Sequence, residues 1–354
     1  MVATHVLDPT DADGSVTTVQ WLAGGRASAL FAVLAGVSLA LVTGGRRPER
    51  GAPLARSALA VVVRGLLVAV VGLALGGLES GLAVILTYYG VMFVLAVPFL
   101  GLGARPLLWL AVGWAAVVPV LSWLVRPGLP ERGFANPSFD QLLTDPARMA
   151  GELMLTGYYP AVPWLAYLLL GLALGRLDLG SRRVAATVAA SGLAVAVAVL
   201  VVSPRLVAAV GGLDAGALAA SEGGMYGQVP TDAWQWLLVA APHSTTPFDL
   251  LQTGGSAAFV LGLCLLVVGL VEDVAGDLGR RTVAVLFGAG TATLSLYSLH
   301  VVMRTEEVWP REDPSTFGLH LLVLLWVGAL LVAFGRRGPL EHLVAVPTRF
   351  VRGR

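Results

Sequence analysis

One short stretch carries side chains that could do proton-transfer chemistry within an otherwise apolar segment. The stretch "TLSLYSLHVVMR" contains Thr293, Tyr297, His300 and Arg304 at successive intervals of four, three and four residues. Such intervals put side chains on one face of an α-helix, and a histidine there can act as a general base or acid. An ionisable residue inside a membrane span costs about 2.5 to 3.5 kcal/mol. We therefore expect this face to line a polar cavity with His300 as a catalytic group; the alternative is a packing histidine bonded to tyrosine or to a backbone carbonyl.

A second polar cluster lies in "APHSTTPFDLLQTGGS", where prolines and glycines bracket several polar side chains. This composition is typical of a broken helix, which membranes tolerate where it is buried in protein or lines a cavity. Asp249 could orient His243, as a carboxylate orients an imidazole in many catalytic pairs. The alternative is a capped helix start, with Thr245 or Thr246 as the N-cap ahead of Pro247.

Single ionisable residues supply further candidates. Arg26 is expected about one turn inside one end of the first apolar segment, and Arg64 about two turns inside the second. A guanidinium suits phosphate or carboxylate recognition, so both are predicted to bind substrate; snorkelling to the interface is the alternative. His5 lies ahead of an acidic loop, whereas His320 and His342 are predicted to be structural.

The composition indicates the elements that must position these residues. With 56% hydrophobic and 13% charged residues among 354, and a mean hydropathy of +0.80, the chain is predicted to be an all-α polytopic membrane protein. A single transmembrane domain is expected over residues 1–340, followed by a cytoplasmic tail over 341–354. Apolar runs of the length needed to cross about 30 Å of hydrocarbon predict about nine transmembrane helices, at 22–43, 57–77, 81–102, 106–125, 160–178, 184–203, 250–271, 283–303 and 316–335.

Arginines concentrate in alternate connections and so predict the orientation. The richer set follows the first, third, fifth, seventh and ninth predicted helices, and the poorer set includes Arg126, Arg132, Arg148, Arg205, Arg304 and Arg311. By the positive-inside rule the C-terminus is cytoplasmic, and the N-terminal residues and the long loops 126–159 and 204–249 face outward. Outer-side tryptophans, Trp309 among them, are expected to be interfacial anchors rather than sugar-stacking groups.

Some chemistry is not expected. Cys264 is the only cysteine, so the chain by itself offers no disulfide framework. The histidines lack the paired spacing of a metal site, and we expect no metal. The expected partners are the lipid bilayer and small molecules, with no nucleic acid.

Four segments together resemble a known family: "GGRASALFAVLAGVSLALVTGG", "YYPAVPWLAYLLLGLALGRLDL", "PHSTTPFDLLQTGGS" and "GTATLSLYSLHVV". They are similar to bacterial members of the heparan-alpha-glucosaminide N-acetyltransferase-like family, within a broader transmembrane acyltransferase superfamily. The resemblance implies that acetyl-CoA or another acyl-CoA is the co-substrate on the cytoplasmic side of a bacterial inner membrane. The acyl group would pass to an outward-facing sugar or envelope glycan.

The resemblance also implies roles for the candidates. His5 and His300 would supply the base, Arg64 and the inner arginines would hold the CoA, and Arg26 with the loop from His243 to Asp249 would hold the acceptor or stabilise the oxyanion. The sugar acetyltransferases carry His-Ala-x-Trp-Asn-Gly before the second family helix, where this chain reads "GSVTTVQWLAGG" without a histidine.

The first helix of the family has only a remnant here. His5 matches a polar position at its end, and we expect the natural reading frame to begin upstream of Met1. Two other functions stay open from the sequence: a transporter or flippase of an envelope precursor, and a non-catalytic scaffold.

Overall fold

The computed structural model describes residues 1–305 and 314–352; Trp309 and Arg311, both predicted on the outer side, lie outside these ranges. The described chain is helical, with one isolated bridge between Thr10 and Val16. Six of its helices are long and apolar enough to cross a membrane, and a bent pair raises the number to seven. The all-α fold with several membrane-length helices is confirmed, whereas the count of nine is not.

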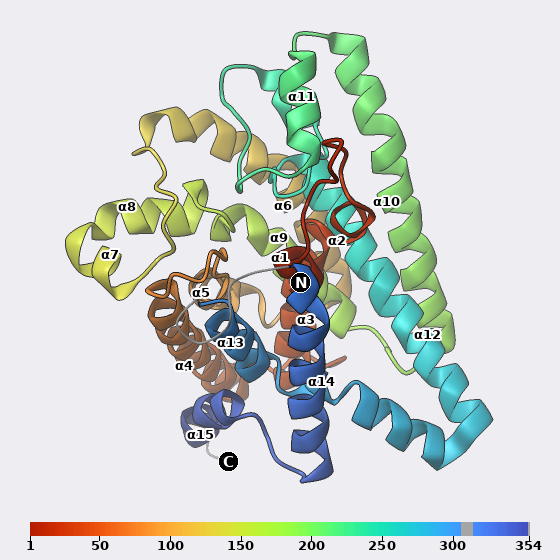
Figure 1. The fold of residues 1–354 in the computed structure, drawn as a ribbon. Helices are drawn as coiled ribbons and strands as arrows, with labels where there is room; N and C mark the ends of the chain where they lie inside the picture. The colour runs from red at the N-terminus through yellow and green to blue at the C-terminus, as the bar shows by residue number, and fades with distance from the viewer. Residues whose placement is uncertain (306–313, 353–354) are drawn as a thin grey trace.

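The helices fall into two groups by length. The longer ones are α3 (Arg26–Val42), which α2 (Thr18–Ala23) precedes, α4 (Gly51–Gly76), α6 (Ala104–Val125), α9 (Ala161–Gly175), α10 (Arg182–Val210), α12 (Pro247–Leu286) and α14 (Phe317–Ala333). The shorter ones are α1 (Val2–Val6), α5 (Leu86–Ala96), α7 (Phe139–Thr144), α8 (Pro146–Gly151), α11 (Ala215–Glu222), α13 (Thr293–Met303) and α15 (Pro339–Arg352). α10 and α12 run side by side along one edge of the bundle, and α4, α5, α13 and α15 gather at the other (Figure 1).

Two predicted membrane helices are shorter than expected. In place of helix 81–102, the regular helix begins only at Leu86, and helix 283–303 is broken around residues 287–292, so that α13 has 11 residues. At 1.5 Å per residue, 11 residues span about 17 Å, roughly half of the hydrocarbon core. The two helices are short because the turn-forming sequences "GGLESG" and "FGAGTA" precede them. A hydropathy average over the whole segment does not detect such turns.

Close backbone contact fixes α3 against α9 at the centre of the bundle. A Cβ on Gly171 would overlap the carbonyl oxygen of Val33, and a Cβ on Gly36 would overlap that of Leu168. Small residues allow such approach between membrane helices. The predicted helix 160–178 corresponds to α9, which bends by 47° from the preceding segment Pro146–Thr156.

Arg176, at the end of α9, ties the ends of three segments together. Its guanidinium is 4% exposed and donates hydrogen bonds to oxygens of the α3 end and of Leu100. The acceptors are the carbonyls of Ala40 (2.8 Å), Thr43 (3.2 Å), Gly45 (2.8 Å) and Leu100 (2.5 Å) and the Thr43 hydroxyl (2.9 Å). The Ala40 carbonyl, in the last turn of α3, also accepts from the Gly45 N–H at 2.9 Å. Arg176 therefore adds donors to the end of α3 from a distant helix and reinforces its cap.

The predicted tail 341–354 is helical as far as the structure describes it, because residues 341–352 belong to α15. Glu341 in its first turn accepts hydrogen bonds from the backbone N–H groups of Leu294 (2.6 Å) and Ser295 (3.1 Å) at the start of α13. At the other end, Arg352 donates to the carbonyl of Val42 at 2.6 Å. α15 therefore bridges the first turn of α13 and the last turn of α3.

Candidate active site

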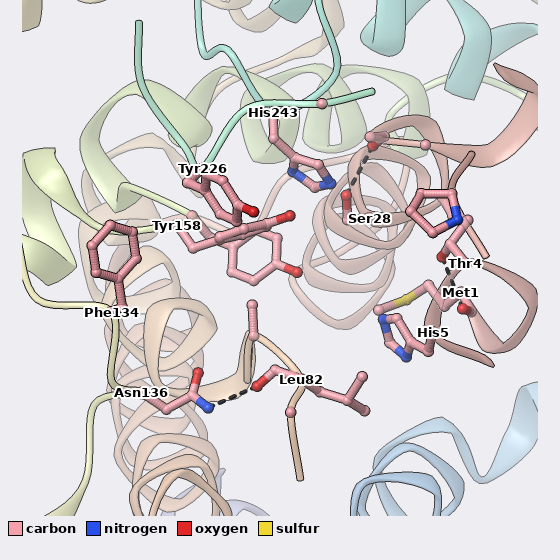
Figure 2. A pocket seen from close by; sticks show the side chains of 18 of the residues that line it. Met1, Thr4, His5, Ser28, Leu82, Phe134, Asn136, Tyr158, Tyr226 and His243 are labelled. Atoms are coloured by element: carbon pink, nitrogen blue, oxygen red, sulfur yellow. Dashed lines mark hydrogen bonds between the residues drawn. The ribbon is translucent and has the colours of Figure 1, made fainter. Parts of the chain in front are cut away.

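A cavity of about 690 Å³ opens beside His5, and we call it the His5 cavity. Its wall comes from segments far apart in the sequence: α1, the start of α3, the extended segment before α5, the loop near Phe134, the tyrosines before α9 and the loop holding His243. Figure 2 shows His5, Tyr158, Tyr226 and His243 around the same space. Its lining is polar and aromatic rather than purely apolar.

Three histidine rings lead from this cavity into the protein. Nδ1 of His5 and Nε2 of His300 lie 3.1 Å apart, so one donates a hydrogen bond to the other. Their rings stack with centroids 5.2 Å apart, and His300 meets the His320 ring edge to face at 5.3 Å. His5 lines the cavity, whereas His300 and His320, each 2% exposed, lie behind it. Burial, followed by the charge of His300, lowers the pKa of His5 well below its ordinary value.

The polar face predicted for the helix at 293–303 points into the protein, but its residues lie in different environments. Tyr297 and His300 are buried, and the Tyr297 hydroxyl accepts a hydrogen bond from the backbone N–H of Ile85 at 3.2 Å. Arg304 lines the His5 cavity, whereas Thr293 lines a second cavity. The face was predictable from spacing, and the separation of its two ends was not.

His243 lies among aromatic rings at the wall of the His5 cavity. Its ring centroid is 4.8 Å from that of Tyr158 and 5.7 Å from that of Tyr159, and it stacks parallel to Trp164 at 6.3 Å. Burial lowers its pKa to about 4, so the imidazole is neutral at physiological pH. Its Nδ1 has no hydrogen-bond partner among the described residues, which leaves a neutral acceptor or donor beside the cavity.

Asp249 belongs to the start of α12. Its Oδ2 accepts a hydrogen bond from the backbone N–H of Thr245 at 2.9 Å. Thr246 is the N-cap and accepts from the Asp249 N–H at 3.0 Å, with Pro247 in the first turn. The capped helix start is therefore confirmed. Within the described residues no hydrogen bond joins Asp249 to His243.

Side chains that the sequence did not single out shape the opposite wall. Asn136 accepts a hydrogen bond from the N–H of Val84 (2.8 Å) and donates to the carbonyl of Leu82 (2.7 Å), which holds the extended segment before α5 (Figure 2). Glu152, 2% exposed, accepts from the N–H of Gly133 (2.7 Å) and from Gln141 (2.6 Å). The only signal in the sequence was that these residues lie in or beside the long predicted outer loop.

A second cavity, of about 760 Å³, lies toward the other end of α3, and we call it the arginine cavity. Four arginines line it, Arg64, Arg337, Arg349 and Arg352, together with Glu341. The guanidinium carbon of Arg64 lies 5.7 Å from the Phe93 ring centroid. The cavity therefore joins a cationic lining to aromatic and aliphatic walls, a combination suited to a phosphorylated ligand with an apolar arm.

Arg26 is engaged locally. Its guanidinium donates to the carbonyl of Trp21 and lies 5.8 Å from the centroid of that ring. The structure therefore places His5, His243 and Arg304 in the wall of the His5 cavity, with His300 behind His5, and it places Thr293 and Arg64 in the wall of the second cavity. Tyr297 and Asp249 are buried and line neither cavity. Within residues 1–305 and 314–352, no group of three or more His, Cys, Asp or Glu side chains is arranged to hold a metal ion.

Comparison with known proteins adds one match. A family model described as "Heparan-alpha-glucosaminide N-acetyltransferase, catalytic" matches residues 2–207, more than half of the chain. No curated protein and no solved structure matches. The matched range contains α1, α3, α4, α5 and α9, and hence His5, Arg26 and Arg64.

Proposed function

We propose that this chain, which belongs to the heparan-alpha-glucosaminide N-acetyltransferase family, is a membrane-bound acyltransferase. It takes an acyl group, most simply acetyl, from acyl-CoA and passes it to a sugar or envelope glycan on the other side of a bacterial inner membrane. The observation that carries the proposal is the pair of cavities at opposite ends of α3, one lined by four arginines and the other by His5.

The arginine cavity suits the donor. The phosphates of CoA would pair with Arg64, Arg337, Arg349 and Arg352, and its pantetheine arm would lie along the apolar walls. Arginine-rich connections mark the cytoplasmic side of a membrane protein, and acyl-CoA is a cytoplasmic metabolite in the proposed setting. Asp and Glu are scarce in the same lining, with Glu341 the single carboxylate among the lining residues.

The His5 cavity suits the acceptor. Tyr158, Tyr226 and Phe134 offer ring faces and hydroxyls of the kind that hold a sugar. The start of α3 also lines this cavity with Ala27 and Ser28, and no side chain caps that helix. The Arg26 N–H donates to the Gly24 carbonyl at 2.8 Å, so the N–H groups of Ala27 and Ser28, which a helix start leaves without intrahelical partners, are the ones that can donate to a developing oxyanion.

The proposed chemistry is a direct acyl transfer. The acceptor amine or hydroxyl attacks the thioester carbonyl carbon, a C–N or C–O bond forms, and the C–S bond breaks. His5 takes the proton of the attacking group and returns it to the departing thiolate, which leaves CoA as the thiol. His300, hydrogen-bonded to His5, fixes the tautomer and ring orientation of His5.

Transfer of radiolabelled acetyl from acetyl-CoA to candidate amino sugars, measured with the detergent-purified full chain, tests this function. His5→Ala is expected to lower kcat by about 10²- to 10⁴-fold, the usual contribution of a general base, and His300→Ala by a smaller factor. Arg64→Ala is expected to raise KM for acetyl-CoA. His342→Ala is the matched control, because His342 is an exposed histidine of α15. Equal activity of His5→Ala and wild type would remove His5 from the mechanism.

One observation favours a transporter as the second candidate. α5 and α13 are half-length helices at the core, and discontinuous helices commonly form the binding sites of secondary transporters. A transporter would move a sugar precursor into vesicles without consuming acyl-CoA. Failure of the wild-type protein to bind any acyl-CoA, together with uptake of such a precursor, would favour this alternative.

A further inference from the structure

The two cavities approach each other within about one helical turn. On α3 the His5 cavity includes Ser28 and the arginine cavity begins at Phe31, three residues or about 4.5 Å further along the helix. Next to α3, Tyr88 lines the first cavity and its neighbour Tyr89 lines the second. What separates the cavities is therefore a thin layer of side chains.

Three aromatic side chains lie where the cavities approach, and we call Phe31, Tyr89 and Tyr297 the aromatic septum: Phe31 and Tyr89 line the arginine cavity, and Tyr297 is buried beside Phe31. The Phe31 ring stacks on Tyr89 with centroids 5.8 Å apart and planes 9° apart, and it lies 6.4 Å from the Tyr297 ring. Tyr89 is 3% exposed and Tyr297 is 7% exposed. The three rings come from α3, α5 and α13; α3 and α5 line both cavities, whereas α13 lines the arginine cavity and Arg304, directly after it, lines the His5 cavity.

The two tyrosines are anchored, and the phenylalanine is not. The Tyr89 hydroxyl donates to the carbonyl of Ser28 at 3.4 Å, and the Tyr297 hydroxyl accepts from the N–H of Ile85 at 3.2 Å. Phe31 has no hydroxyl, lines the arginine cavity and is half-buried. Rotation of Phe31 therefore breaks only van der Waals contacts, whereas rotation of either tyrosine also breaks a hydrogen bond inside the protein.

We infer that the aromatic septum is a gate that closes the passage between the two cavities, and that Phe31 is its moving part and limits the size of the acyl group that passes. The gate stands on the geometry alone. The size limit rests on the proposed function, because it concerns the acyl group delivered from the arginine cavity. A thioester held there can reach the acceptor beside His5 only where this layer opens.

Cysteine accessibility tests the gate without any catalytic assay. In a Cys264→Ser background, Ala83→Cys places a thiol in the His5 cavity and Ser38→Cys places one in the arginine cavity. A membrane-impermeant methanethiosulfonate is applied to one side of sealed vesicles of defined orientation. With Phe31 present, each thiol is expected to react from its own side only.

Phe31→Ala is expected to make the thiol of Ala83→Cys reactive from both sides. Leu41→Ala, a truncation on the same helix at a residue 59% exposed, is the matched control and keeps one-sided labelling. Phe31→Trp retains an aromatic ring and is expected to stay one-sided, which separates loss of the ring from loss of the fold. Two-sided labelling with Phe31 intact, or one-sided labelling in Phe31→Ala, would overturn the gate.

Donor preference tests the size limit. The ratio of kcat/KM for butyryl-CoA to that for acetyl-CoA is expected to rise about 10-fold or more in Phe31→Ala, since each methylene accommodated in an apolar site changes discrimination by about 10- to 200-fold. An unchanged ratio in a variant with two-sided labelling would overturn the size limit. If no donor supports transfer, but the cysteine variants that keep Phe31 are still labelled from one side only, the proposed function is overturned and the gate is supported.

Discussion

Replacing Arg176 by alanine is expected to destabilise the protein more than replacing any exposed arginine. The substitution removes hydrogen bonds to five oxygen acceptors on two segments, residues 40–45 and Leu100. The carbonyls of Ala40 and Thr43 also accept from the N–H groups of Gly45 and Glu49, so three oxygens lose their donor, namely the Gly45 and Leu100 carbonyls and the Thr43 hydroxyl. Each buried acceptor left unpaired costs about 1 to 3 kcal/mol, and water entering the vacated space recovers part of that. The net loss is therefore about 3 to 5 kcal/mol, toward the lower end of the range for three such acceptors.

Arg176→Lys gives a graded version of the same perturbation. An ammonium has three donors in place of five and cannot reproduce the planar geometry of the guanidinium. With one of the three oxygens that depend on Arg176 left unpaired, we expect a loss of about 2 kcal/mol. The ranking is wild type, then Arg176→Lys, then Arg176→Ala.

Thermal unfolding in a mild detergent, followed by tryptophan fluorescence, measures the effect. A loss of 3 to 5 kcal/mol is expected to lower Tm by roughly 6 to 15 °C, by the scaling for large domains. Arg46→Ala is the control, because Arg46 pairs with Asp178 in a bridge whose side chains are 67% and 45% exposed, and such pairs contribute about 0 to 1 kcal/mol. Equal Tm values for Arg176→Ala and Arg46→Ala would refute the assignment of Arg176 as a cap of α3.

Three further predictions concern the walls of the two cavities. Burial holds the pKa of His243 at about 4, against 6.5 for the ordinary side chain, so between these pH values the unfolded chain binds a proton that the folded chain does not. Stability should therefore fall as pH drops from about 6.5 to about 4. In a plot of Tm against pH, His243→Gln should flatten that slope. Glu341→Gln should lower Tm, with a loss of about 1 kcal/mol in the free energy of unfolding, because it removes a negative charge from the start of α13, where Glu341 accepts from the N–H groups of Leu294 and Ser295. A Tm equal to that of wild type would show that this cap does not stabilise the fold. Asn136→Ala removes the hydrogen bond that holds the segment at Leu82. In the transfer assay with each substrate varied, KM for the acceptor should rise several-fold while KM for acetyl-CoA stays unchanged. A change in KM for acetyl-CoA alone would contradict the placement of the acceptor beside this segment.

The sequence predicts which face of a helix is polar better than it predicts what that face meets. Spacing alone placed Tyr297 and His300 on an interior face, because helical geometry is local. It could not place His320 against His300, since that contact depends on how α14 packs on α13. The role of Arg176 was unpredictable for the same reason. In the positive-inside rule Arg176 and Arg46 count equally, and only the tertiary fold shows that Arg176 is a buried cap and that Arg46 is exposed.

Two of the nine predicted membrane helices are too short to cross a membrane as regular helices, for a related reason. Hydropathy over about 20 residues measures how apolar a segment is on average, and it is insensitive to a short turn of glycine and alanine. The break at residues 287–292 and the extended segment before Leu86 are both apolar enough to pass. Both produce the short helices that carry Tyr89 and Tyr297 of the aromatic septum, so the least predictable part of the fold is the part nearest to the proposed chemistry.

The glycine contact between α3 and α9 makes α3 a rigid part shared by both cavities. A rigid rod that forms a wall of two binding sites transmits any tilt imposed at one site to the other. If binding in the arginine cavity shifts α3 by a fraction of an ångström, the affinity of the His5 cavity changes by a coupling free energy, and the same free energy acts in reverse. Donor and acceptor affinities are then expected to be linked reciprocally, and a side chain added at Gly36 or Gly171 would alter both affinities at once.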